Sequence, residues 1–257
     1  TMRNRSKWIL FTAVLALAAM PALSQEGDVP TARQVVDRYI EAMGGEEAIR
    51  ANISMVRDGN MVLVGQGMSA DIVVKAMAPD KMKMEMTIPG MGSIQSGFDG
   101  EVGWAMNPMT GPMLLEGKEL SQAMRQADFY SVLHGENLYS AMTNTGSVEF
   151  EGSPCWKVEL TTHDGDTITE YYNQETGLID GMTQTQASAM GDVTITTLVT
   201  EYKKFGEVMS PTRMVAQIGP GMEQVVTIES ISAEGVTEAD FAGQKMLIYF
   251  GYTYCPD

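Results

Sequence analysis

The 257-residue sequence is poor in the residues that build disulfide scaffolds, histidine metal sites and nucleic-acid interfaces. It has 2 cysteines and 2 histidines, which excludes a disulfide-rich miniprotein and leaves little for a histidine metal centre or a catalytic triad. Its 17 basic residues face 33 acidic ones, and a net charge of −16 repels phosphate backbones. It also lacks nucleophile-elbow, P-loop and dinucleotide motifs. We therefore predict no nucleic-acid partner, no enzyme activity and no cofactor.

Residues 1–24 have the layout of a cleaved secretory signal peptide. A short basic start precedes the apolar stretch 9–20, and Ala22-Leu23-Ser24 places small residues before a cleavage site. After this leader no segment approaches the ~18 consecutive apolar residues typical of a membrane helix. We expect an exported, periplasmic protein, with an uncleaved N-terminal anchor as the alternative.

Helical periodicity is confined to a few segments. Residues 30–43 predict a helix with one apolar face, and Gly44-Gly45 supplies its stop. One more turn of helix is expected over 46–51, and one or two helices over 117–133.

Most of the chain from residue 53 onward alternates apolar and polar residues, which is typical of strands with one buried face. The clearest runs are 71–76, 81–86, 156–161, 193–200 and 213–218. Turn signals separate the runs, at 58–60, 78–80, 89–92, 99–100, 164–166, 175–177 and 219–221. This spacing predicts ten or eleven consecutive antiparallel strands.

So few helices cannot cover so long a sheet if it is flat. We therefore predict an α+β, mainly β fold: a curved antiparallel sheet that forms an unclosed half-barrel over two or three helices, with a partial extra strand at the C-terminus. A curled sheet that is incompletely filled leaves a cavity, and a fully packed interior is the alternative.

The sequence has 22 methionines, and flexible thioether side chains suit surfaces that accept ligands of variable shape. Met82, Met84 and Met86 share one strand face, and Met91 and Met106 lie in or beside the following loops. Two other interpretations stay open: methionine as a replacement for leucine in the core, and soft-metal coordination by Met-x-Met clusters.

Several motifs together resemble exported bacterial proteins of the LolA/LolB-like outer-membrane lipoprotein-sorting family. The resemblance covers about residues 30–232 and rests on the segments 39–47 (YIEAMGGEE), 79–81 (PDK), 97–101 (GFDGE) with Trp104, 107–112 (NPMTGP), 127–130 (ADFY), 151–155 (EGSPC), 171–178 (YYNQETGL) and 201–202 (EY).

This resemblance implies a domain over 25–235 that is an unclosed β-barrel over helices, with an apolar cavity for lipid or lipoprotein acyl chains. We also expect a monomer, with an envelope protein as a second partner beside the acyl chains. We assign ligand binding to Met82, Met84, Met86, Met91, Trp104 and Met106. For Trp104, packing in the core is the competing role. Carriers of this family also use a cavity-facing arginine to control a lid, and the quoted motifs contain no match for it.

The segment 236–257 resembles the start of the Sco/SenC family, thioredoxin-like proteins that handle copper, through the run Phe250-Gly-Tyr-Thr-Tyr-Cys-Pro-Asp257. In that family this strand ends at the first cysteine of a Cys-x-x-x-Cys pair, and a distant histidine completes the site. Only Cys255 is present here, and it is the one residue assigned as a metal ligand. We interpret 236–257 as a truncated module. The alternatives are a copper-handling or thiol-redox fusion, and a native last strand with a chance match.

Overall fold

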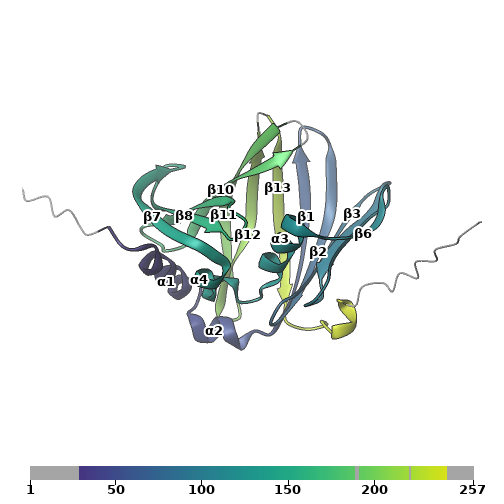
Figure 1. Ribbon diagram of the computed structural model, residues 1–257, viewed down its shortest axis with the longest axis horizontal. Coiled ribbons are helices and arrows are strands. Elements are labelled where there is room, and N and C mark those ends of the chain that lie inside the picture. Colours follow the sequence, from purple (N-terminus) through teal and green to yellow (C-terminus); the bar gives the residue numbers. More distant parts are fainter. Residues whose placement is uncertain (1–28, 189–190, 220, 242–257) are drawn as a thin grey trace, which may run out of the picture.

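The computed structural model describes residues 29–188, 191–219 and 221–241. The predicted leader, the predicted strand near residues 246–250 and Cys255 lie outside the described residues. The described chain is mainly β, with a single antiparallel sheet of 13 strands that bends round a few helices and does not close (Figure 1). This confirms the predicted half-barrel. In the described ranges no helix has the length and apolar character of a membrane span.

The helices are short and the strands are long. The helical elements are α1 (Ala32–Ala42), α2 (Glu46–Ala51), α3 (Gly117–Ala127) and α4 (Gly135–Leu138), with 3-10 turns η1 (Ser131–Leu133) and η2 (Glu238–Asp240). The strands are β1 (Ser54–Val64), β2 (Met68–Met77), β3 (Lys81–Ile88), β4 (Gly92–Phe98), β5 (Gly103–Asn107), β6 (Gly111–Leu114), β7 (Tyr139–Phe150), β8 (Ser153–Thr162), β9 (Thr167–Asn173), β10 (Ile179–Ser188), β11 (Gly191–Phe205), β12 (Val208–Ile218) and β13 (Glu223–Ser232).

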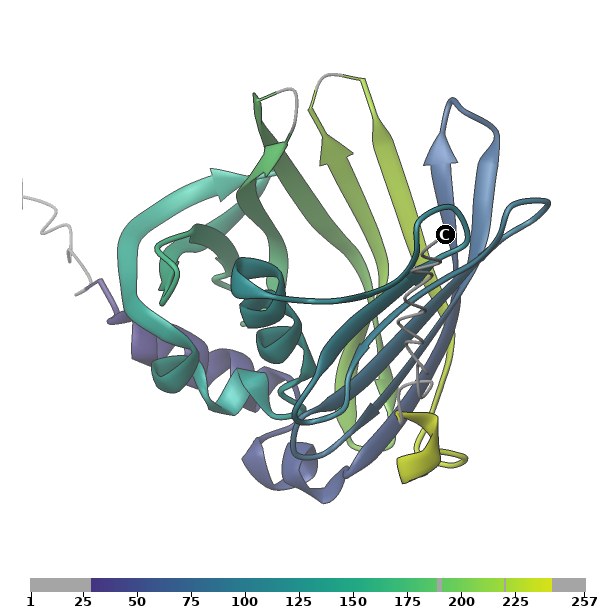
Figure 2. The same cartoon turned by 45° about the vertical axis from the view of Figure 1, so that its right-hand side comes forward.

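The strand order explains why helices occupy the concave side of the sheet. Strands β1 to β6 form one meander and β7 to β13 form another, and pairing of β1 with β13 joins them in the middle of the sheet. The outer edges are therefore β6 and β7, which are consecutive in the chain. Their connection has to cross the sheet, and α3, η1 and α4 lie on that crossing, inside the curve (Figure 2).

Local sequence signals fix helix α1 against the sheet. Thr31 and Gln34 form a capping box at its start. Gly44, with a φ of 121°, ends it, and a Cβ at this position would lie 2.3 Å from the Glu207 carbonyl oxygen. The backbone N–H of Met209 donates to the Met43 carbonyl at 2.8 Å. The end of α1 is thus held against the start of β12.

The core of the β7–β13 half forms where α1 packs on the sheet. Val35 and Val36 of α1 are buried against Val158, Leu160 and Tyr172 of β8 and β9. The Tyr39 and Tyr172 rings meet edge to face, with centroids 5.6 Å apart. The apolar face predicted for the first helix is therefore the face that is buried.

Two details of the sequence prediction are wrong. The sheet has 13 strands in place of ten or eleven, and Asp58-Gly59-Asn60 lies inside β1 where a turn was predicted. Pairing of β1 with β13 shifts register between Asp58 and Gly59, so this turn-like sequence forms a β-bulge. A Cβ at Gly59 would lie 2.3 Å from the Thr227 carbonyl oxygen, so the close approach of β13 requires glycine there.

Candidate functional site

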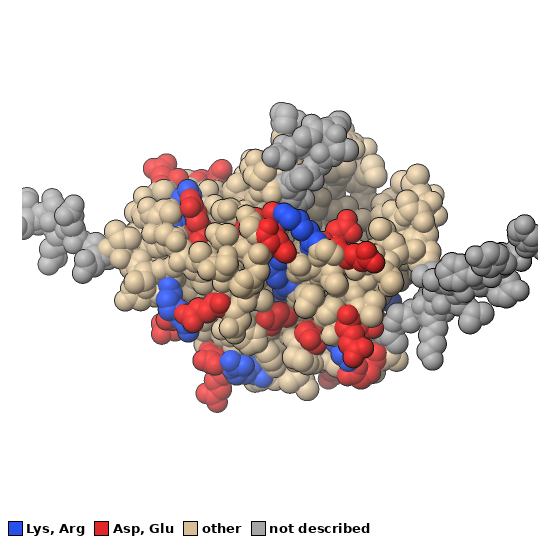
Figure 3. Space-filling model, in the orientation of Figure 1, with Lys and Arg blue, Asp and Glu red and all other residues tan. Residues whose placement is uncertain are grey.

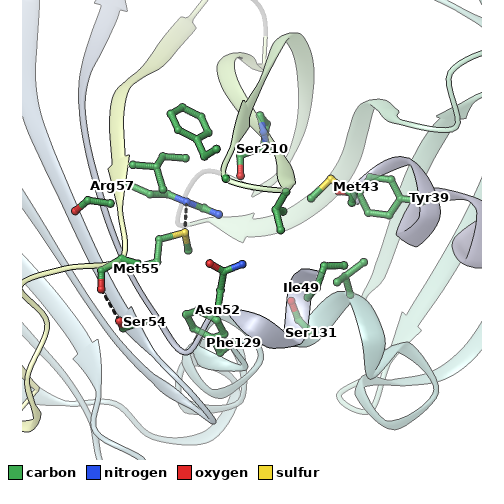
Figure 4. A pocket seen from close by; sticks show the side chains of 18 residues that line it. Tyr39, Met43, Ile49, Asn52, Ser54, Met55, Arg57, Phe129, Ser131 and Ser210 are labelled. Atoms are coloured by element: carbon green, nitrogen blue, oxygen red, sulfur yellow. Dashed lines mark hydrogen bonds between the residues drawn. The ribbon is translucent and has the colours of Figure 1, made fainter. Parts of the chain in front are cut away.

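A cavity of about 410 Å³ lies at the helix-covered end of the half-barrel, bounded by the α1–α2 segment, β1, the β11–β12 hairpin, the end of β13 and the segment after α3 (Figure 4). Most of its 18 lining residues are apolar. They are Tyr39, Met43, Ile49, Asn52, Ser54, Met55, Arg57, Phe129, Ser131, Val132, Phe205, Gly206, Val208, Ser210, Pro211, Ile231, Ser232 and Ala233.

Hydrogen bonds hold the walls of this cavity together. The Ser54 hydroxyl donates to the Ala233 carbonyl at 2.8 Å, which ties the start of β1 to the end of β13. The Asn52 side chain donates to the Ala48 carbonyl at 2.9 Å and closes the end of α2. The Tyr130 hydroxyl donates to the Asn52 carbonyl at 3.0 Å. Three segments far apart in sequence, around residues 48–54, 130 and 233, therefore form one fixed boundary.

Arg57 is the only charged side chain among the 18 that line the cavity. It pairs with Val74 of β2, and its side chain points into the cavity (Figure 4). Its Nε donates to the sulfur of Met55 at 3.2 Å. Burial lowers the pKa of the Arg57 guanidinium, but arginine stays protonated in proteins. The cavity is thus apolar with one positive charge.

A second cavity, of about 220 Å³, adjoins the first on the side of strands β8 to β10. The two share Tyr39, Ser131 and Val132 as lining residues. The second cavity contains the carboxyl of Glu170, which accepts a hydrogen bond from the Tyr172 hydroxyl. Burial raises the pKa of Glu170, so its carboxyl resists ionisation. The interior is therefore not completely filled, as the curled-sheet argument allowed.

Solved structures with the same architecture come from bacterial proteins of low sequence identity. A LolA superfamily protein from Nitrosomonas europaea matches with a TM-score of 0.58 and 14% identity over 83% of this chain and 98% of that chain. A putative outer membrane lipoprotein-sorting protein domain from Vibrio parahaemolyticus gives 0.57 and 11%, over 82% and 97%. A DUF1329 family protein from Desulfovibrio piger gives 0.56 and 11%, over 82% and 96%.

The chain has a LolA-like fold. The SCO1/SenC family matches only residues 228–257, which begin inside β13. No curated protein matches the chain by sequence. The LolA-like half-barrel thus accounts for the described architecture, and the SCO1/SenC similarity is confined to the C-terminal end.

The structure brings three of the predicted ligand-binding residues together on the concave face. Met82, Met84 and Met86 pair with Ala76, Val74 and Ile72 of β2, on the same face as Arg57. Helix α3 lies against β3, β4 and β5. Helix α3 therefore packs near this trio, and none of the three lines the 410 Å³ cavity, whose methionines are Met43 and Met55.

Three other predicted site residues lie elsewhere. Trp104 pairs with Gly97 and Met106 pairs with Gln95, which places both on the convex face, opposite Met82, Met84 and Met86. The Trp104 ring lies over Gly97, since a Cβ there would be 3.0 Å from it. Its indole N–H is buried, with no partner within the described chain. Met91 is 57% exposed in the β3–β4 turn. The six residues therefore do not surround one cavity.

The metal assignment at Cys255 lies outside the described residues. In the ranges that are described, no three His, Cys, Asp or Glu side chains gather in a way that could hold a metal ion. Cys155 is buried beside Asp180, and burial raises the pKa of its thiol to about 12. This cysteine is therefore an inert core residue at neutral pH.

Sequence reasoning missed Arg57, Met55 and Tyr39 as lining residues. A signal for two of them was present, because Met55 and Arg57 are two positions apart in a strand and must share a face. The arginine on an otherwise apolar face was the unusual feature. Tyr39 lies in the helix predicted over 30–43, and no sequence rule shows that the apolar face of this helix ends at a cavity.

Proposed function

We propose that this protein is a carrier-like protein of the bacterial periplasm that shelters acyl chains of a lipid or lipoprotein. The observation that carries the proposal is the 410 Å³ cavity inside a LolA-like half-barrel, with mostly apolar walls. The Vibrio parahaemolyticus neighbour is described as a putative outer membrane lipoprotein-sorting protein domain, which supports the lipoprotein part of the proposal. The leader-like residues 1–24 support export.

The physical case for a carrier rests on the cost of exposing an acyl chain to water. Each buried CH₂ contributes about 0.8 kcal/mol, so moving a chain across an aqueous compartment requires an apolar hollow. Met43 and Met55 give the walls flexible side chains that adapt to chains of different shape. The adjoining 220 Å³ space gives a longer chain room to continue past Tyr39. We further propose a monomer without enzyme activity, which could deliver cargo to an envelope partner.

The surface charge supports a cargo that is not a nucleic acid. Figure 3 shows acidic and basic side chains in small separate groups among uncharged ones, and the described part of that face has no continuous basic surface. Electrostatic attraction to a phosphate backbone needs such a surface.

The test is native mass spectrometry of protein purified without detergent from its own envelope. We expect a bound lipid or acyl species on the wild type. Ser210 is 6% exposed and lines the cavity, so Ser210→Leu should fill part of the space and reduce bound lipid several-fold. Ser69→Leu, at an exposed position of β2, is the matched control and should keep the lipid. Ligand-free wild-type protein from every preparation would contradict the proposal.

A second candidate is a copper-handling or thiol-redox function, which is favoured by the SCO1/SenC similarity over 228–257. Cys255 would be its ligand, and a single thiolate needs further ligands to bind copper tightly. Titration of the full chain with Cu(I) distinguishes the two candidates. Stoichiometric binding that Cys255→Ser abolishes would favour the copper function, and absence of binding would favour the carrier.

A further inference from the structure

Among the residues that the structure describes, no carboxylate pairs with the positive charge of Arg57, although the protein is strongly acidic. Asp and Glu outnumber Lys and Arg by 33 to 17, yet none of the 18 residues lining the cavity is acidic. Three other arginines reach carboxylates: Arg33 to Asp37, Arg50 to Glu46 and Arg125 to Asp164. Within the described chain, Arg57 has only the weak sulfur acceptor of Met55.

Arg57 is half-buried, and this arrangement carries a cost for the empty protein. A charge that loses part of its water without gaining a partner is destabilised. The guanidinium has a planar array of N–H donors that fits two oxygens of a carboxylate or phosphate. Figure 4 shows Arg57 entering the cavity from β1, with Asn52 and Ser210 also lining the space around it. An anion at this point would satisfy both the charge and the free donors.

We propose that the cavity takes a single-chain anionic amphiphile, whose carboxylate or phosphate head group binds Arg57 while its acyl chain lies along the apolar walls. This inference rests on the proposed carrier function and names the chemistry of its cargo. The volume of the cavity agrees with a ligand of this size, because 410 Å³ is near the lower end of the ~300–1,000 Å³ range of ligand pockets. That size suits one chain better than several.

The side chains that line the cavity indicate the direction in which the acyl chain of the ligand lies. Met43, Ile49 and Val208 provide apolar surface in the same cavity, and Tyr39 and Val132 lead on to the adjoining space. Glu170 lies in that second space, and burial keeps its carboxyl from ionising readily. A negative head group is therefore favoured at Arg57, and the uncharged tail is favoured on the side of Tyr39.

The test compares three ligands that have the same chain and different head groups: hexadecanoate, hexadecyl phosphate and hexadecanol. Binding is measured by isothermal titration to delipidated wild type, Arg57→Met and Arg57→Lys. Arg213→Met is the control, because Arg213 is also a strand arginine and does not line the cavity. Circular dichroism checks that each variant is folded.

We expect the wild type to bind one or both anions ~10- to 100-fold more tightly than the alcohol, as a charged hydrogen bond requires. Arg57→Met should lose that preference and keep its affinity for hexadecanol. Arg57→Lys should keep part of the preference, and Arg213→Met all of it. The stronger of the two anions identifies the head group as carboxylate or phosphate.

Two different failures can be told apart. Equal affinity of the wild type for the anions and the alcohol, or an unchanged anion preference in Arg57→Met, overturns the role of Arg57 and leaves the carrier function standing. Absence of binding by all three ligands, together with lipid-free native protein, overturns the carrier function itself.

Discussion

Replacing Arg57 by methionine should stabilise the lipid-free protein. The guanidinium lies in a mostly apolar cavity, and its Nε donates to the Met55 sulfur at 3.2 Å. A fully buried donor without a partner costs about 1–3 kcal/mol, and the half-buried Arg57 guanidinium keeps part of its hydration, so its cost lies at the low end of this range. Methionine keeps an unbranched apolar stem of similar reach and removes the charge. We therefore expect the free energy of unfolding to rise by about 1 kcal/mol.

The assay is urea and thermal unfolding of delipidated protein, because a bound lipid would stabilise the wild type and hide the effect. A gain of 1 kcal/mol corresponds to about 2–4 °C in Tm for a domain of this size. Arg213→Met should change stability by no more than about 0.5 kcal/mol. A loss of stability in Arg57→Met would show that Arg57 has a structural partner, and would refute the view that it is kept for a ligand.

Three other measurements test separate parts of the structure. Gly44→Ala should lower the free energy of unfolding in urea by about 1–3 kcal/mol or more, because Gly44 has a positive φ and an added Cβ would lie 2.3 Å from a backbone oxygen. Gly45→Ala is the control and should cost less, because an added Cβ there has nothing within 4 Å. Equal losses in the two variants would contradict the close packing at Gly44. In the wild type, the free energy of unfolding should fall as pH rises above the ordinary carboxyl pKa, because the buried Glu170 keeps a proton that the unfolded chain has lost. Glu170→Gln should make this fall smaller. Identical plots of stability against pH for the two proteins from pH 4 to pH 8 would refute the burial of Glu170. Cys155, with its pKa near 12, should react with iodoacetamide only on unfolding, and rapid alkylation of its peptide in the native protein would contradict its place in the core.

The sequence was sufficient for the fold class because its signals are local and agree with one another. Strict alternation over 81–86 and 156–161 gave strands that the structure contains as β3 and β8. Gly44-Gly45 ended the first helix where the structure ends it. The shortage of helices then required the sheet to curve.

The strand order could not be predicted in the same way, because it depends on contacts between distant residues. Nothing near Gly59 indicates that β13, more than 150 residues later, passes so close that only glycine fits. The same contact converts a turn-like sequence into a bulge. Pairing of β1 with β13 also determines that the helical connection crosses the concave side.

The site was only partly predictable for a related reason. Alternation shows which residues of a strand share a face, but the cavity depends on which part of that face a helix covers. Met82, Met84 and Met86 lie on the concave face of β3, which α3 contacts, whereas Met55 and Arg57 line the cavity. Their contact with a ligand stays a prediction.

The most direct test of the central claim is to find where an acyl chain binds. A fatty acid with a photoreactive diazirine in its chain is bound to the delipidated protein, irradiated, and located by peptide mass spectrometry. We predict saturable labelling of the segments that line the cavity, around residues 39–57, 129–132, 205–211 and 231–233. Labelling confined to the exposed hairpins near Met91 and Met109, or labelling that an unlabelled fatty acid fails to compete, would contradict the account.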